Sequence, residues 1–119
     1  MRGMPPFDAA LLLHEYADEG LVRDLARLVV ETTPAQIQAV QSAVINKDAA
    51  ALRSAAHKLR GSIVTFGLPD AVATAKRLEE MGAAGDLAGA DTLSHQLAAD
   101  VQSLRESAKA WLERGAALP

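Results

Sequence analysis

Apolar residues recur at helical spacing along most of the chain, and no stretch shows the strict alternation of a β-strand. From Ala49 to Phe66 the apolar positions step by four, three, four and three, at Leu52, Ala56, Leu59, Ile63 and Phe66. After residue 86, steps of four and three again separate the apolar positions, at Leu93, Leu97, Val101, Leu104, Ala108 and Trp111. Each set forms one face of a helix, so the pattern predicts helices that pack on one another.

Capping residues divide the first half of the chain into helices. Asp8 can cap a short first helix, with Phe7 placed to pack on Leu12. After a break at residues 18–20, a second helix begins near Leu21. Thr33 and Pro34, followed by a capping-box glutamine, predict that this helix ends near residue 32 and that another starts at Pro34.

The second half has equally clear boundaries. Asp48 can cap the helix from Ala49, and Gly67 stands where a helix-ending residue belongs. Pro69 can start a further helix that stops at residues 82–85. Asp86 can cap the last and longest helix.

Length and composition support an all-α fold in a single domain, residues 1–119. A chain of 119 residues suits one compact domain. Half of its residues are apolar but only 3% are aromatic, so the core is built from Ala, Leu and Val, as in helix-on-helix packing.

Charge and cysteine content exclude several classes of function. The formal charge of −3, with 12 scattered Lys and Arg residues, provides no basic surface for nucleic acid. Cysteine is absent, which excludes disulfides and thiolate chemistry. No stretch approaches the roughly 20 apolar residues of a membrane span, and residues 1–7 do not resemble a signal peptide, so we expect a cytoplasmic protein without a membrane anchor.

His57 is the residue on which chemistry can be expected. At about 100° per residue, it lies about 140° from the core stripe of its helix, and Gly61 lies about 180° from it, so both face outward one turn apart. Glycine inside a helix costs roughly 1 kcal/mol relative to alanine. Because a side chain four residues after a histidine would obstruct another protein's approach to the imidazole, we interpret Gly61 as clearance.

The surroundings of His57 suit phosphoryl chemistry. Lys58 and Arg60, with Lys76 as a further candidate, can place positive charge near a phosphoryl group on the ring. A neutral imidazole attacks phosphorus through one nitrogen if a partner fixes the proton on the other. A carboxylate on the neighbouring helix could be that partner.

The segment His57-x-x-Arg60-Gly61-Ser62, followed by Phe66-Gly67, resembles the signature of histidine-containing phosphotransfer (HPt) domains. The resemblance extends from about Leu21 to Leu112 and implies an antiparallel four-helix bundle, with its core at about residues 21–113, and a short accessory N-terminal helix. Glu79, 22 positions after His57, matches the family's polar residue that orients the histidine. Arg60 departs from the family's more frequent lysine, which affects partner preference more than activity.

The resemblance also implies a function. His57 would accept a phosphoryl group from a receiver-domain aspartate or a kinase and pass it to another receiver domain. The protein would be a phosphoryl carrier without a cofactor of its own rather than an enzyme, since the partner receiver would supply the aspartate and Mg²⁺. Its partners would be response-regulator receiver domains and a sensor or hybrid histidine kinase.

Two other functions fit the same pattern. The dimerisation helices of sensor kinases also expose a histidine, but they usually carry a proline soon after it, where this chain has Gly61-Ser62. A helical interaction module could bind a regulator through the surface around Gly61 and Leu68 without accepting phosphate. His14 and His95 lack such surroundings, and no histidine pair has metal-ligand spacing.

Overall fold

Residues 6–114 are described by a computed structural model, and every regular element among them is helical. The α-helices are α1 (Ala9–Tyr16), α2 (Glu19–Ile45), α3 (Ala49–Ile63), α4 (Pro69–Ala84) and α5 (Ala90–Glu113), with a 3₁₀ turn, η1 (Val64–Phe66), after α3. The all-α prediction is therefore confirmed. None of the described helices is both long and apolar enough to cross a bilayer.

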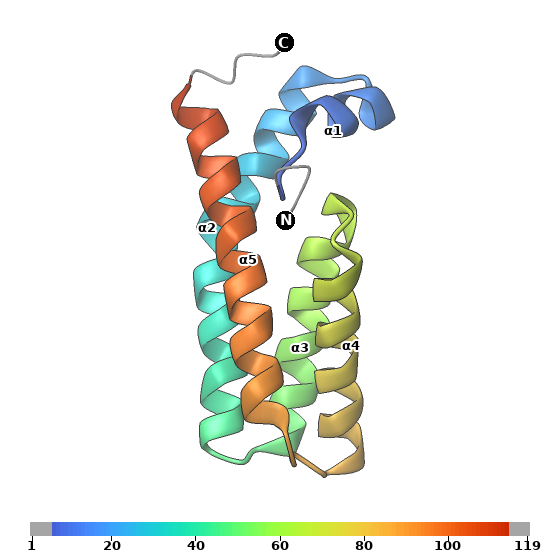
Figure 1. The fold of residues 1–119 in the computed structure, drawn as a ribbon, viewed down its shortest axis with the longest axis vertical. Helices are drawn as coiled ribbons and strands as arrows, with labels where there is room; N and C mark the ends of the chain where they lie inside the picture. Colours follow the sequence, from blue (N-terminus) through green and yellow to red (C-terminus); the bar gives the residue numbers. More distant parts are fainter. Residues whose placement is uncertain (1–5, 115–119) are drawn as a thin grey trace.

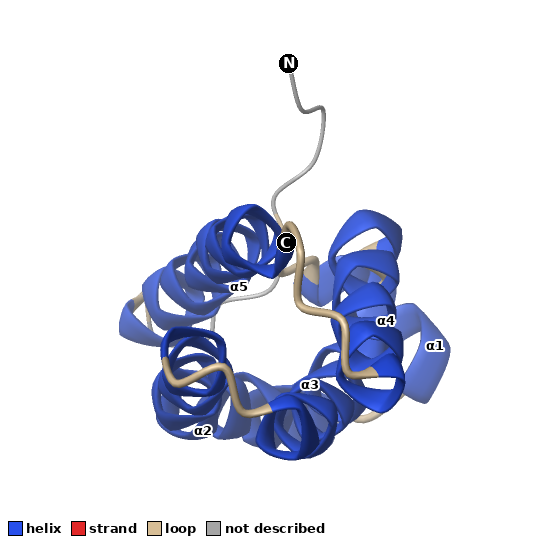
Figure 2. Ribbon diagram, turned by 90° about the horizontal axis from the view of Figure 1, so that it is seen from below, coloured by secondary structure: helices blue, strands red, loops and turns tan. Residues whose placement is uncertain are grey.

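The four long helices α2–α5 surround one core (Figures 1 and 2). Successive helices run in opposite directions along the long axis, and α1 lies across one end, against α2 (Figure 1). Around the ring, α2 packs on α3 and α5, and α4 packs on α3 and α5. The closeness of α3 to α4 decides the geometry of the site described below.

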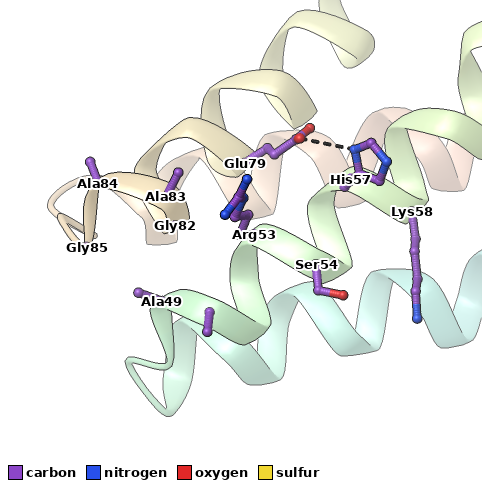
Figure 3. A pocket seen from close by; sticks show the side chains of 11 residues that line it. Ala49, Arg53, Ser54, His57, Lys58, Glu79, Gly82, Ala83, Ala84 and Gly85 are labelled. Atoms are coloured by element: carbon purple, nitrogen blue, oxygen red, sulfur yellow. Dashed lines mark hydrogen bonds and ion pairs between the residues drawn. The ribbon is translucent and has the colours of Figure 1, made fainter.

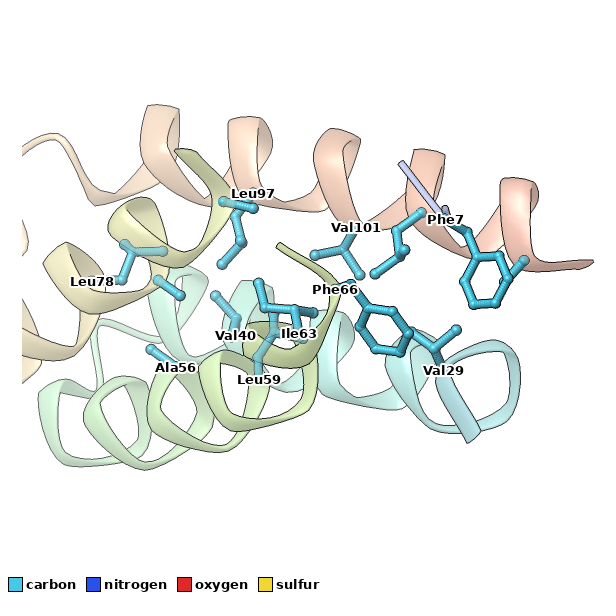
Figure 4. Close-up of a cluster of buried hydrophobic side chains, with 14 of the residues drawn as sticks. Phe7, Val29, Val40, Ala56, Leu59, Ile63, Phe66, Leu78, Leu97 and Val101 are labelled. Atoms are coloured by element: carbon cyan, nitrogen blue, oxygen red, sulfur yellow. The ribbon is translucent and has the colours of Figure 1, made fainter. Parts of the chain in front are cut away.

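The core is aliphatic along its length and aromatic at the end near α1 (Figure 4). The apolar stripe predicted for residues 49–66 is buried. Phe7 is buried like Leu12, and its ring packs on Phe66 and Trp111 at centroid distances of 5.9 and 5.3 Å. Phe7, which precedes α1, thus helps to close this end of the core.

Most of the predicted helix boundaries are confirmed. The carboxylates of Asp8 and Asp48 accept hydrogen bonds from backbone N–H groups at the starts of α1 and α3. Pro69 is the first residue of α4. Gly67 and Gly85 adopt left-handed backbone angles, with φ of 66° and 73°, which glycine tolerates at a helix end.

The predicted break at Pro34 is wrong, because α2 continues through this residue to Ile45. Proline has no N–H, so the carbonyl of Val30, four residues earlier, loses its helical partner. Nε of Arg105, on α5, donates to that carbonyl at 3.0 Å. One residue earlier, the hydroxyl of Thr33 donates to the carbonyl of Val29 at 2.6 Å. A side chain from another helix therefore supplies the hydrogen bond that the carbonyl of Val30 loses to Pro34.

The predicted cap of the last helix is also wrong. The carboxylate of Asp86 accepts from the N–H of Ala88, within the loop, and α5 begins only at Ala90. Gly89 precedes it at φ 85°, with no side-chain cap. Nor is α5 the longest helix, since it has 24 residues and α2 has 27.

Candidate functional site

Gly82 allows α3 and α4 to approach each other very closely. It is buried in the last turn of α4. A Cβ atom at this position would lie 2.6 Å from the backbone nitrogen of Arg53 and 2.7 Å from the carbonyl oxygen of Ala49, both on α3. These distances are too short for any side chain. The sequence pattern assigned Gly82 to a helix end, but its structural role is this backbone contact.

His57 and Glu79 meet across the seam between α3 and α4. Nδ1 of the imidazole lies 3.0 Å from Oε2 of the carboxylate, and a dashed line marks this contact in Figure 3. The His57 side chain is 65% exposed, whereas that of Glu79 is only 20% exposed. The imidazole is thus exposed to solvent, and the less exposed carboxylate of Glu79 binds it from the protein side.

Arg60 binds the other oxygen of the same carboxylate. Its Nε and Nη2 lie 3.0 and 2.9 Å from Oε1 of Glu79. The two carboxylate oxygens therefore have separate partners, Arg60 on one and His57 on the other. This division fixes the carboxylate plane relative to the imidazole. The sequence predicts that Arg60 places its charge near a phosphoryl group, whereas in the structure its guanidinium binds Glu79.

These contacts keep Glu79 ionised. Partial burial by itself raises the pKa of Glu79, but hydrogen bonds from His57 and Arg60 and attraction to both side chains outweigh it, so the pKa lies below its ordinary value. An ionised carboxylate can only accept hydrogen bonds. The proton between the two groups therefore resides on Nδ1 of His57.

This tautomer leaves the lone pair of the neutral imidazole on Nε2. Figure 3 shows this second ring nitrogen on the side of the ring away from Glu79. A nitrogen that is exposed, unprotonated and held in one orientation is a nucleophile available to another molecule.

The helix surface beyond His57 is bare. A Cβ at Gly61, one turn after His57, would meet nothing within 4 Å. Lys58 is exposed, and its side chain points away from the imidazole (Figure 3). Lys76 is exposed too and has no interaction with Glu79 in residues 6–114.

An open hollow of about 710 Å³ adjoins His57 on the side of the α3 N-terminus. Its walls are mainly small residues, with Arg53 among them: Ala49, Ala50, Arg53, Ser54, His57, Lys58, Glu79 and Gly82 to Gly85. Sequence reasoning missed Arg53. Its position four residues before His57, on the same helical face, was the signal that could have found it.

The other two histidines have ordinary surroundings. Nδ1 of His95 donates to the carbonyl of Asp91 at 2.8 Å, within one turn of α5, and His14 is exposed. Across residues 6–114, no three His, Asp or Glu side chains are grouped so that they could hold a metal ion.

Comparison with known proteins gives a family. The family model described as the Hpt domain matches residues 24–107, which include His57, Arg60, Gly61 and Glu79. Searches of curated proteins and of solved structures gave no match. The match covers most of the chain, so this protein belongs to the Hpt domain family.

Proposed function

We propose that this protein is a histidine phosphotransfer protein of a two-component phosphorelay. Domains of this family are phosphocarrier modules rather than catalysts. His57 accepts a phosphoryl group from a receiver-domain aspartate or from a kinase and passes it to another receiver domain. The proposal rests on one observation above all, the exposed imidazole whose Nδ1 lies 3.0 Å from a Glu79 carboxylate with a lowered pKa.

In the proposed step, the lone pair on Nε2 of His57 attacks phosphorus and forms an N–P bond. The bond between phosphorus and the partner's aspartate oxygen breaks, and its electrons leave with the carboxylate. The proton on Nδ1 stays in place, and the positive charge that develops on the ring is balanced by Glu79. Reversal of this step delivers the phosphoryl group to the next receiver domain.

The neighbouring residues have distinct parts in this proposal. Glu79 orients the imidazole and stabilises its charged form. Arg60 acts through Glu79, because its guanidinium binds the carboxylate oxygen that does not face His57. Gly61 leaves room for the partner, and Lys58 adds positive charge at the edge of the site.

The partners are the remaining part of the proposal. We expect response-regulator receiver domains and a sensor or hybrid histidine kinase, with Mg²⁺ held by the receiver domain. We also infer that the 119 residues act as one HPt domain on an antiparallel four-helix bundle, in the cytoplasm.

The first experiment measures phosphate incorporation from a panel of receiver domains, phosphorylated beforehand with acetyl phosphate and Mg²⁺. We expect acid-labile, base-stable label on the wild-type protein and none on His57→Gln. His95→Gln is the matched control, since it removes another exposed histidine, whose carboxylate neighbour within residues 6–114 is Asp91 of its own helix. Label that persists on His57→Gln would overturn the assignment. Binding of receivers without labelling would indicate an interaction module.

A further inference from the structure

We propose that Arg53 selects the docking partner by binding an acidic side chain of the receiver domain that approaches His57. This inference rests on the proposed function, because it concerns how the phosphoryl donor or acceptor is recognised. It assigns a role to a residue outside the hydrogen-bonded group of His57, Glu79 and Arg60.

Arg53 is a cation without a counter-charge. It is exposed, and residues 6–114 offer it no ion pair or hydrogen bond from its guanidinium. Arg60, on the same helix, already binds Glu79 through Nε and Nη2, and its side chain is only 32% exposed. Of these two arginines, only Arg53 can therefore bind another protein without breaking a contact in this one.

A partner that reaches His57 must also cover Arg53. Four residues along a helix correspond to about 6 Å. A standard interface buries roughly 800 Å² on each partner, which corresponds to a disc with a radius of about 16 Å. A receiver domain centred on His57 would therefore extend well past Arg53, even if the interface were smaller than average.

The surface beside Arg53 has room for a partner's side chain. The hollow of about 710 Å³ extends from His57 to the ends of α3 and α4. Ala83, Ala84 and Gly85 form the part contributed by the end of α4, and none of them has a long side chain that would fill it. Figure 3 shows Arg53 between this end of α4 and Glu79, at the edge of the open space.

Desolvation determines what the partner must offer. A guanidinium covered by another protein without an acceptor loses its hydration and gains nothing in return, which weakens binding substantially. An aspartate or glutamate would restore the lost hydrogen bonds and could do so through two of them. A lysine or arginine in the same place would be repelled. Arg53 therefore favours receivers that are acidic at this point.

The phosphoryl group itself is a less suitable ligand for Arg53. The free ring nitrogen of His57 lies on the side of the ring away from Glu79, whereas Arg53 lies on the Glu79 side (Figure 3). A phosphoryl group on that nitrogen would thus point away from Arg53. The geometry favours a contact with the partner over a contact with the transferred group.

The test compares Arg53→Glu with Arg77→Glu. Both variants change the charge by the same amount at an exposed helix position, but Arg77 faces a different groove, between α4 and α5. The donor is the receiver domain that labels the wild type fastest. We expect Arg53→Glu to lower kcat/KM for transfer about tenfold, mainly by raising KM, and Arg77→Glu to change it less than about twofold. Arg53→Gln should give an intermediate loss and a weaker dependence on salt.

A second readout uses phosphoramidate, a small donor that needs no protein docking. We expect it to label His57 at similar rates in the wild type and in the Arg53 variants. Slower labelling of these variants would show that Arg53 acts on the imidazole or the phosphoryl group, which would overturn the docking proposal. Equal transfer by Arg53→Glu and Arg77→Glu would overturn it as well. Failure of phosphoramidate to label the wild type would instead count against the phosphotransfer function itself.

Discussion

Gly61 and Gly82 both stand inside helices, where glycine costs about 1 kcal/mol relative to alanine, yet their surroundings are opposite. A Cβ at Gly82 would lie 2.6 Å from the backbone of α3, so the fold requires glycine there. A Cβ at Gly61 would meet nothing within 4 Å. Packing within the fold therefore does not require glycine at position 61, and contact with another molecule is the alternative reason for it.

The two glycines serve the same histidine from different directions. Gly82 brings α4 close enough for Glu79 to bind Nδ1 of His57, and this happens inside the molecule. Gly61 leaves open the surface one turn beyond His57, where the proposed partner would arrive. The comparison therefore separates a glycine that the packing of α3 and α4 requires from one that we propose provides access for a partner, and variants at each position can test this difference.

The largest effect should come from Gly61→Arg. An arginine here extends into open space, so the free energy of unfolding should not fall. Transfer from a receiver domain should slow on the order of 100-fold, a loss typical of a blocked interface centre. Transfer rates and urea unfolding of the same preparation check both parts. Unchanged transfer would contradict the clearance role.

Gly82→Ala should act in the opposite way. Its methyl group would overlap the backbone of α3, which must move away, and overpacking of this kind costs about 1–3 kcal/mol. We expect lower stability in urea and, because Glu79 moves with α4, slower labelling of His57 by phosphoramidate. A variant as stable as the wild type would show that the two helices separate without cost.

Gly61→Ala provides the matched control for Gly82→Ala. Alanine fits the open position and has the higher helix propensity, so the stability should rise by about 1 kcal/mol. Thermal or urea unfolding measures this gain. A loss of stability would mean that the surface at Gly61 is less open than the structure indicates.

The smallest effect should be on how the free energy of unfolding depends on pH, through the contact between Glu79 and His57. The pKa of Glu79 is lower in the folded protein than in the unfolded chain, so its contribution to stability is complete above the unfolded value. That contribution disappears as pH falls through the folded pKa. The difference in unfolding free energy between wild type and Glu79→Gln should therefore shrink as pH falls below the ordinary glutamate pKa of about 4.5. A difference that grows as pH falls below about 4.5 would contradict the lowered pKa.

Local patterns predicted much of the site and the fold. The 3.6-residue period located the core positions of α3, and Asp48, Gly67 and Pro69 marked boundaries that the structure confirms. The same period placed His57 and Gly61 on the outer face. The contact between Arg60 and Glu79 could not be predicted in this way, because sequence spacing gives the helical face of Arg60 but not its partner on another helix. Arg53 was missed because a single exposed arginine has no distinctive pattern.

The sequence by itself determined the helical class, the family and the histidine with its glycine, because these follow from residue types and short spacings. Tertiary structure decided what depends on atoms far apart in the chain. Helix α2 passes through Pro34 because Arg105, 75 residues after Val30, supplies the missing hydrogen bond. Glu79 is held in position because Gly82 lets two backbones touch. Local propensity cannot predict either outcome, since the compensating group comes from another helix.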